Sequence, residues 1–91
     1  MQTPTPTESL IVYPSDFPIK IMGITQDAFA QTMVELVMLH DPDFHAGKME
    51  MRPSSNGNYL SLTVTIRATS REQLDNLYRA LSSHPMVKVV L

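Results

Sequence analysis

Hydrophobic and polar positions alternate most regularly over residues 60–68, where we predict a β-strand. Two sets of residues alternate in this segment: Leu60, Leu62, Val64, Ile66 and Ala68 against Ser61, Thr63, Thr65 and Arg67. Successive side chains of a strand point to opposite faces of its sheet, so this pattern is typical of a sheet that is buried on one face only. We expect the hydrophobic set to face the core and the polar set to face water.

Three shorter segments are also predicted as strands, over residues 17–23, 48–52 and 86–91. The positions expected to face the core are Phe17, Ile19 and Ile21 in the first segment and Met49 and Met51 in the second. Proline is tolerated near the start of a strand, which accommodates Pro18. The last segment is rich in valine, a residue with high strand propensity.

Helical spacing of hydrophobic residues predicts a helix between the first two strands. It is expected to begin near Thr25, whose side chain can cap it, and to end at Asp41 and Pro42. The periodic positions are Phe29, Met33, Leu36, Val37 and His40. They place one hydrophobic stripe along the helix.

A second helix is predicted after the third strand. Thr69 and Ser70 offer capping pairs with Glu72 and Gln73. The hydrophobic stripe consists of Leu74, Leu77, Tyr78 and Leu81. Residues 82–85, which end in a proline, stop the helix.

The order of these elements, βαββαβ, predicts an α+β fold of the ferredoxin-like type. Right-handed crossovers around a central hairpin give a four-stranded antiparallel sheet, order 4-1-3-2, with two helices on one face. Residues 23–25, 54–58 and 82–85 should then lie at one end of the sheet, and residues 41–47 at the other.

Length and composition favour one small domain without export or membrane signals. The 91 residues, 43% hydrophobic, suffice for one core, which we place in residues 10–91, after a Thr-Pro tail at residues 1–9. No apolar run approaches the roughly 20 residues that span a bilayer. The net charge of −2 disfavours nucleic acid, and the lack of cysteine excludes disulfides and thiolate sites. We expect a cytoplasmic protein.

The polar turn at residues 54–58 is the main candidate for a binding site. In the functional interpretation, its hydroxyl and backbone N–H groups, with the guanidinium of Arg52, bind a carboxylate. Gly23 and Thr25 would complete the site from the start of the first helix. The candidate residues are Gly23, Thr25, Arg52, Ser54, Ser55, Asn56, Gly57, Asn58 and Tyr59. The alternative is a purely structural hairpin loop, in which Gly57 supplies a positive φ and an asparagine caps its own backbone.

Other candidate chemistry is weaker. His40, Asp41, Asp43 and His45 are residue types that bind divalent metals, but Pro42 splits them and a solvated loop at the helix end is favoured. We assign no catalytic residue, metal or cofactor, and expect no enzymatic activity.

Several spaced blocks resemble the YbeD-like family of small uncharacterised bacterial proteins over residues 10–91. The blocks are Phe17, residues 20–23, residues 53–59 with Ser61, Ala68-Thr69, and residues 87–91. The resemblance implies an ACT-like, ferredoxin-like fold similar to amino-acid-sensing modules, and a role in binding lipoate or regulating its metabolism. It carries no catalytic residue with it.

Together these observations predict a regulatory module that binds a small acidic metabolite or a partner enzyme. The alternative is a structural protein–protein interaction domain without a small-molecule ligand. The exposed edges of the sheet, in strands two and four, also predict a homodimer. A monomer remains the alternative, with Lys88 and residues 10–14 protecting the edge of strand four.

Overall fold

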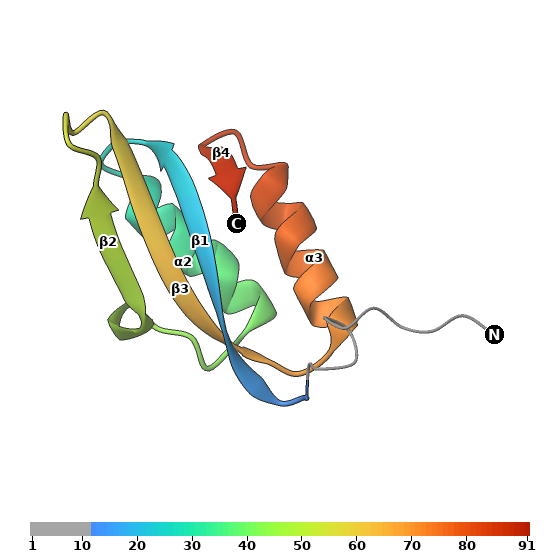
Figure 1. The fold of residues 1–91 in the computed structure, drawn as a ribbon. Helices are drawn as coiled ribbons and strands as arrows, with labels where there is room; N and C mark the ends of the chain where they lie inside the picture. The colour runs from blue at the N-terminus through green and yellow to red at the C-terminus, as the bar shows by residue number, and fades with distance from the viewer. Residues whose placement is uncertain (1–11) are drawn as a thin grey trace.

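The computed structural model describes residues 12–91, which fold into one antiparallel sheet with two helices on one face (Figure 1). The elements are β1 (Ser15–Ile24), α2 (Phe29–His40), the 3-10 turn η1 (Ala46–Lys48), β2 (Met49–Pro53), β3 (Tyr59–Ala68), α3 (Arg71–Ser82) and β4 (Val87–Val90). The sheet order is β2-β3-β1-β4. The predicted ferredoxin-like fold and strand order are confirmed. The predicted tail at residues 1–9 lies outside the described residues.

The core lies between the helices and the inward face of β1 and β3. The residues predicted to face inward from β3 are buried, except Leu60, which is partly buried. Both helices direct their predicted stripes into the same space. The buried hydrophobic residues are Ile19, Ile21, Phe29, Met33, Val34, Val37, Phe44, Leu62, Val64, Ile66, Ala68, Leu74, Leu77 and Leu81. The binary pattern therefore decides which face of the sheet the helices cover.

The loops meet at one end of the sheet, as the topology requires. The backbone N–H of Thr25 donates a hydrogen bond to the carbonyl of Asn58 at 2.9 Å, which ties the end of β1 to the hairpin loop. Gly23 lies against the carbonyl oxygen of Met86 and the ring of Phe29. The start of α2, the β2–β3 hairpin and the α3–β4 connection therefore lie together at the top of Figure 1.

Thr25 does not cap the first helix, so this prediction is wrong. The cap position of α2 is Ala28, which makes no side-chain capping bond. β1 runs to Ile24, which pairs with Tyr59, and the bond from Thr25 to Asn58 holds the next residue beside the hairpin. Pairing across the sheet thus outweighs the local capping signal.

The side chains of β2 point to the predicted faces of the sheet, but they are less buried than predicted. Met49 and Met51 pair with Val64 and Leu62, so both lie on the helix-bearing face. Met49 is half-buried, whereas Met51 is 58% exposed. β2 is an edge strand, and Figure 1 shows α2 behind β3 and β1, with β2 at the margin. Lys48 belongs to η1, before the strand begins.

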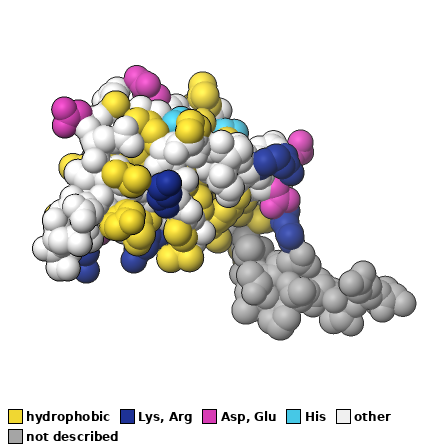
Figure 2. Space-filling model, turned by 90° about the horizontal axis from the view of Figure 1, so that it is seen from above, with side chains coloured by type: hydrophobic (Ala, Val, Ile, Leu, Met, Phe, Trp, Pro, Cys, Tyr) yellow, Lys and Arg dark blue, Asp and Glu magenta, His cyan; other side chains and the backbone are white. Residues whose placement is uncertain are grey.

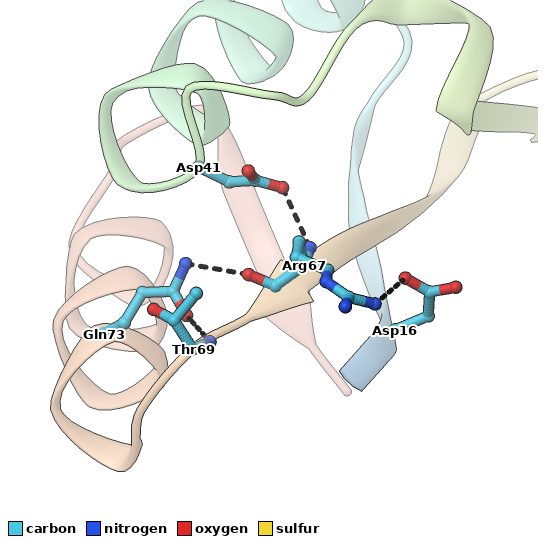
Figure 3. A network of polar contacts seen from close by, with 5 residues as sticks. All are labelled: Asp16, Asp41, Arg67, Thr69 and Gln73. Atoms are coloured by element: carbon cyan, nitrogen blue, oxygen red, sulfur yellow. Dashed lines mark hydrogen bonds and ion pairs between the residues drawn. The ribbon is translucent and has the colours of Figure 1, made fainter. Parts of the chain in front are cut away.

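A polar network joins the ends of α2, β3 and α3 at the opposite end of the sheet (Figure 3). The buried carboxylate of Asp41 accepts hydrogen bonds from the N–H groups of Arg67 at 2.9 Å and Asp43 at 3.1 Å. Gln73 donates to the carbonyls of Arg67 and His40 and accepts from the N–H of Thr69. The side chain of Ser70 caps α3 by accepting from the N–H of Gln73, as predicted.

Candidate functional site

The face of the sheet opposite the helices carries polar side chains in register across three strands. In one row Arg52 of β2 pairs with Ser61 of β3, which pairs with Met22 of β1. In the neighbouring row Glu50 pairs with Thr63, which pairs with Lys20. Directly opposite residues share a face and lie about 5 Å apart at Cβ. The two rows therefore place two basic groups on either side of two hydroxyls.

Two of the shallow grooves on this face are bordered by Arg52. The larger has a volume of about 610 Å³ and is lined by Lys20, Glu50, Met51, Arg52, Ser61 and Thr63. The smaller has about 210 Å³ and is lined by Met22, Arg52, Pro53, Ser54, Tyr59 and Ser61. Arg52 and Ser61 border both grooves. They connect the open face of the sheet to the base of the hairpin loop.

The hairpin loop uses many of its polar groups to hold its own shape. Oδ1 of Asn56 accepts hydrogen bonds from the hydroxyl of Ser54 at 3.0 Å and the N–H of Asn58 at 3.1 Å. Oγ of Ser54 accepts from the N–H of Tyr59, and the N–H of Gly57 donates to the carbonyl of Ser54. Gly57 has φ +77°, the positive value that favours glycine. These bonds match the structural interpretation of the loop.

The nine candidate residues fall into three groups. Arg52, Ser54 and Tyr59 line the grooves. Ser55, Asn56, Gly57 and Asn58 form the exposed tip of the loop. Gly23 is buried, and Thr25 is exposed and bonded through its N–H to Asn58. Neither of these two lines a groove described above.

Lys20, Ser61 and Thr63 are among the groove residues that the candidate set lacks. Their outward direction follows from the alternation along β1 and β3. Their place beside Arg52 follows only from the register of the sheet, in which β3 lies between β1 and β2. The predicted strand order contained this signal, because it made these three strands neighbours.

Hydrophobic side chains are also exposed at the hairpin end of the open face. Ile24 and Tyr59 pair across β1 and β3, and both are 46% exposed. Val89 of β4 pairs with Met22 and is 43% exposed. Figure 2, viewed from the hairpin end, shows hydrophobic side chains gathered on the lower side with basic side chains between them. The grooves beside Arg52 are therefore bordered by apolar side chains.

Asp41 and His45, which follow α2, bond to the backbone through their side chains, and the burial of Asp41 contradicts the predicted solvated loop at that residue. Nδ1 of His45 accepts from the N–H of Gly47 and caps η1, while Asp41 is 2% exposed and bonds to β3. Among residues 12–91, no group of three or more His, Asp or Glu residues is arranged to hold a metal ion. His84 accepts from the N–H of Met86 in the turn before β4.

Tyr78 has a shifted pKa, and it lies away from the grooves. Tyr78 is on α3 and packs partly buried against the core. Burial raises its pKa above the ordinary value of 10.0, because the charged phenolate loses more solvation free energy there than the neutral phenol does.

Comparison with known proteins places this sequence among small bacterial proteins. The family model described as "Protein of unknown function (DUF493)" matches residues 8–91. A UPF0250 protein from Janthinobacterium sp. (strain Marseille) is 74% identical over 86 residues, 94% of each chain. The UPF0250 protein of Bordetella pertussis is 65% identical over 86 residues, again 94% of each chain.

The solution structure of protein HP0495 from H. pylori shares the fold. It superimposes with a TM-score of 0.73 at 20% identity and covers 99% of this chain and 98% of its own. Within residues 12–91, neither α2 nor α3 is long and apolar enough to cross a membrane.

Proposed function

The chain belongs to the DUF493 family of proteins of unknown function, and from this premise we propose that it is a regulatory module that binds a small carboxylate-bearing metabolite on the open face of its sheet. Membership bears out the resemblance to YbeD-like proteins. The proposal is carried by one observation: Arg52 borders both grooves, and Lys20 borders the larger one from across β3.

The side chains of the grooves suit a carboxylate bound to an organic body. A guanidinium and an ammonium supply charge-assisted hydrogen bonds to the carboxylate, and the hydroxyls of Ser61 and Thr63 are neighbouring neutral partners. Glu50 in the larger groove would attract an amino group, as an amino acid carries. Tyr59 and Met22 in the smaller groove offer apolar surface for the remainder of the ligand.

The proposed site is centred on Arg52 and extends the one inferred from the sequence. Arg52, Ser54 and Tyr59 are retained as contacts, and Lys20, Ser61 and Thr63 are added. The loop tip, residues 55–58, then supports the site by fixing the end of β2. Gly23 and Thr25 support the adjoining turn.

Thermal-shift screening against amino acids, lipoate and related carboxylates tests the proposal. A ligand that binds only the folded state stabilises it by about 2.7 kcal/mol at a concentration of about 100 times Kd. Arg52→Ala is expected to weaken that ligand's binding about ten- to hundredfold, because a charge-assisted hydrogen bond is lost. Arg79→Ala, on α3 and outside both grooves, is the matched arginine control and should leave binding unchanged.

The amide analogue of the same ligand is the chemical control, since it has the shape but not the charge. Equal binding of acid and amide would contradict the carboxylate site. If no carboxylate stabilises the protein, the second candidate is favoured, a protein–protein interaction domain. The exposed hydrophobic residues Ile24, Tyr59 and Val89 on the open face support that candidate.

A further inference from the structure

Strand β2 forms one open edge of the sheet, and its backbone N–H and carbonyl groups determine which hydrogen bonds that edge can make. The N–H of Ser54 donates to the carbonyl of Tyr59, so Ser54 directs its backbone toward β3. In an antiparallel ladder every second residue directs its N–H and carbonyl to the same neighbouring strand, so the backbone groups of Arg52 and Glu50 also point toward β3. Met51 therefore directs its N–H and carbonyl away from β3, at the free edge. Pro53 also lies on this outward register and has no N–H, as is common in edge strands.

The side chains along this edge have a self-complementary pattern. Glu50 and Arg52 are both exposed and both lie on the open face, because they pair with Thr63 and Ser61. Met51 lies between them on the other face and is 58% exposed. An acid and a base therefore lie two positions apart, with an exposed apolar residue at the centre.

A two-fold axis perpendicular to the sheet can pair this edge with itself in only a few registers. Such an axis keeps the helix-bearing faces of both copies on the same side of the joined sheet. Even-numbered residues of β2, which lie on the open face, are therefore opposite even-numbered residues of the second copy. With Met51 on the axis, Glu50 of each copy lies opposite Arg52 of the other. A shift of two residues in either direction instead places Glu50 opposite Glu50 or Arg52 opposite Arg52. Like charges directly opposite each other are unfavourable.

We propose that two copies of this chain associate through β2 in the register centred on Met51. The two Met51 residues exchange two backbone hydrogen bonds, and their side chains cover each other on the helix-bearing face. Two Glu50–Arg52 ion pairs form on the open face. The result is a continuous eight-stranded sheet in which the exposed edge of β2 is lost. The occupant is a second copy because the charge pattern is complementary to itself.

Charge reversal with mixing tests the register. Glu50→Lys gives a copy with two positive charges at the edge, and Arg52→Glu gives one with two negative charges. Each variant alone should dimerise about tenfold more weakly than the wild type, because two attractive pairs become repulsive. An equimolar mixture should form a heterodimer, in which both pairs are attractive again. Sedimentation velocity over a range of concentrations, in a buffer without carboxylates, measures the dimer dissociation constants of each variant and of their mixture.

Recovery of dimerisation on mixing distinguishes the proposal from a folding defect, because a misfolded variant does not regain dimerisation when the second variant is added. Lys88→Glu on β4 is the matched control for the opposite edge and should leave the wild-type dimer constant unchanged. A wild type that stays monomeric up to its solubility limit overturns the proposal. It is also overturned if the single variants dimerise as the wild type does, if the mixture fails to associate, or if Lys88→Glu has the larger effect.

Discussion

The carboxylate of Asp41 holds the backbone N–H of Arg67 at 2.9 Å, and so joins the end of α2 to the end of β3. The carbonyl of the same Arg67 accepts from Gln73 at 3.1 Å. Both backbone groups of one strand residue are thus fixed by side chains, from Asp41 just after α2 and from Gln73 in α3 (Figure 3). This arrangement anchors the end of the sheet opposite the proposed binding site.

Removing this carboxylate should destabilise the fold. Asp41→Ala is expected to lower the free energy of unfolding by about 1–3 kcal/mol, because it leaves part-buried N–H groups of Arg67 and Asp43 without their acceptor. Urea unfolding followed by circular dichroism measures the change. Asp43→Ala is the control, since the Asp43 side chain is exposed. Equal effects of the two substitutions would contradict the role given to Asp41.

Gly23 should not tolerate a larger residue, because of close packing at the hairpin end. A Cβ at this position would lie 2.7 Å from Cζ of Phe29 and against the backbone carbonyl of Met86, which cannot rotate away. Gly23→Ala is expected to cost about 1–3 kcal/mol of stability.

Gly57→Ala provides a contrast in mechanism for the same substitution. Nothing lies within 4 Å of a Cβ there, but φ is +77°. Its cost should be about 1 kcal/mol, from backbone strain alone. Thermal unfolding of both variants tests the pair, and a neutral Gly23→Ala would show that the packing of Gly23 against Phe29 and Met86 is loose.

The strand at residues 60–68 and the second helix could be predicted because their periodicities are regular over several turns or pairs. The strand order followed from handedness and element order. The failed prediction at Thr25 has a different origin. Its N–H bonds to Asn58, and such a contact between distant segments leaves no local trace in the sequence.

Met51 and Asp41 show two further limits of sequence patterns. Alternation gave the correct face for Met51, but the extent to which a helix covers an edge strand is not encoded in alternation. Asp41 was considered only as a metal ligand or a solvated helix end. Its partner, the N–H of Arg67, is a backbone group that every sequence offers. The candidate site was predicted from the polar turn at residues 54–58, and Arg52, Ser54 and Tyr59 entered it because they are neighbours in the sequence.

The two proposals share Arg52, which predicts a linkage between them. A carboxylate on the open face and Glu50 of a second copy would compete for the same guanidinium. The strongest carboxylate from the screen should therefore weaken the dimer, and dilution to monomer should tighten carboxylate binding by the same factor. Sedimentation with and without this carboxylate measures the coupling. A dimer that tightens with ligand would indicate that Arg52 is not shared.

Stability should fall in alkaline solution in a way that depends on Tyr78. Burial raises the pKa of this phenol in the folded state, so the folded state retains a proton that the unfolded state has lost. The contribution is fully present below the unfolded pKa, about 10, and is lost as pH rises through the folded value. Tyr78→Phe removes the titrating group and should lose less stability between neutral and alkaline pH than the wild type. Urea unfolding of both proteins across this range is the measurement, and parallel pH profiles would show that Tyr78 titrates alike in both states.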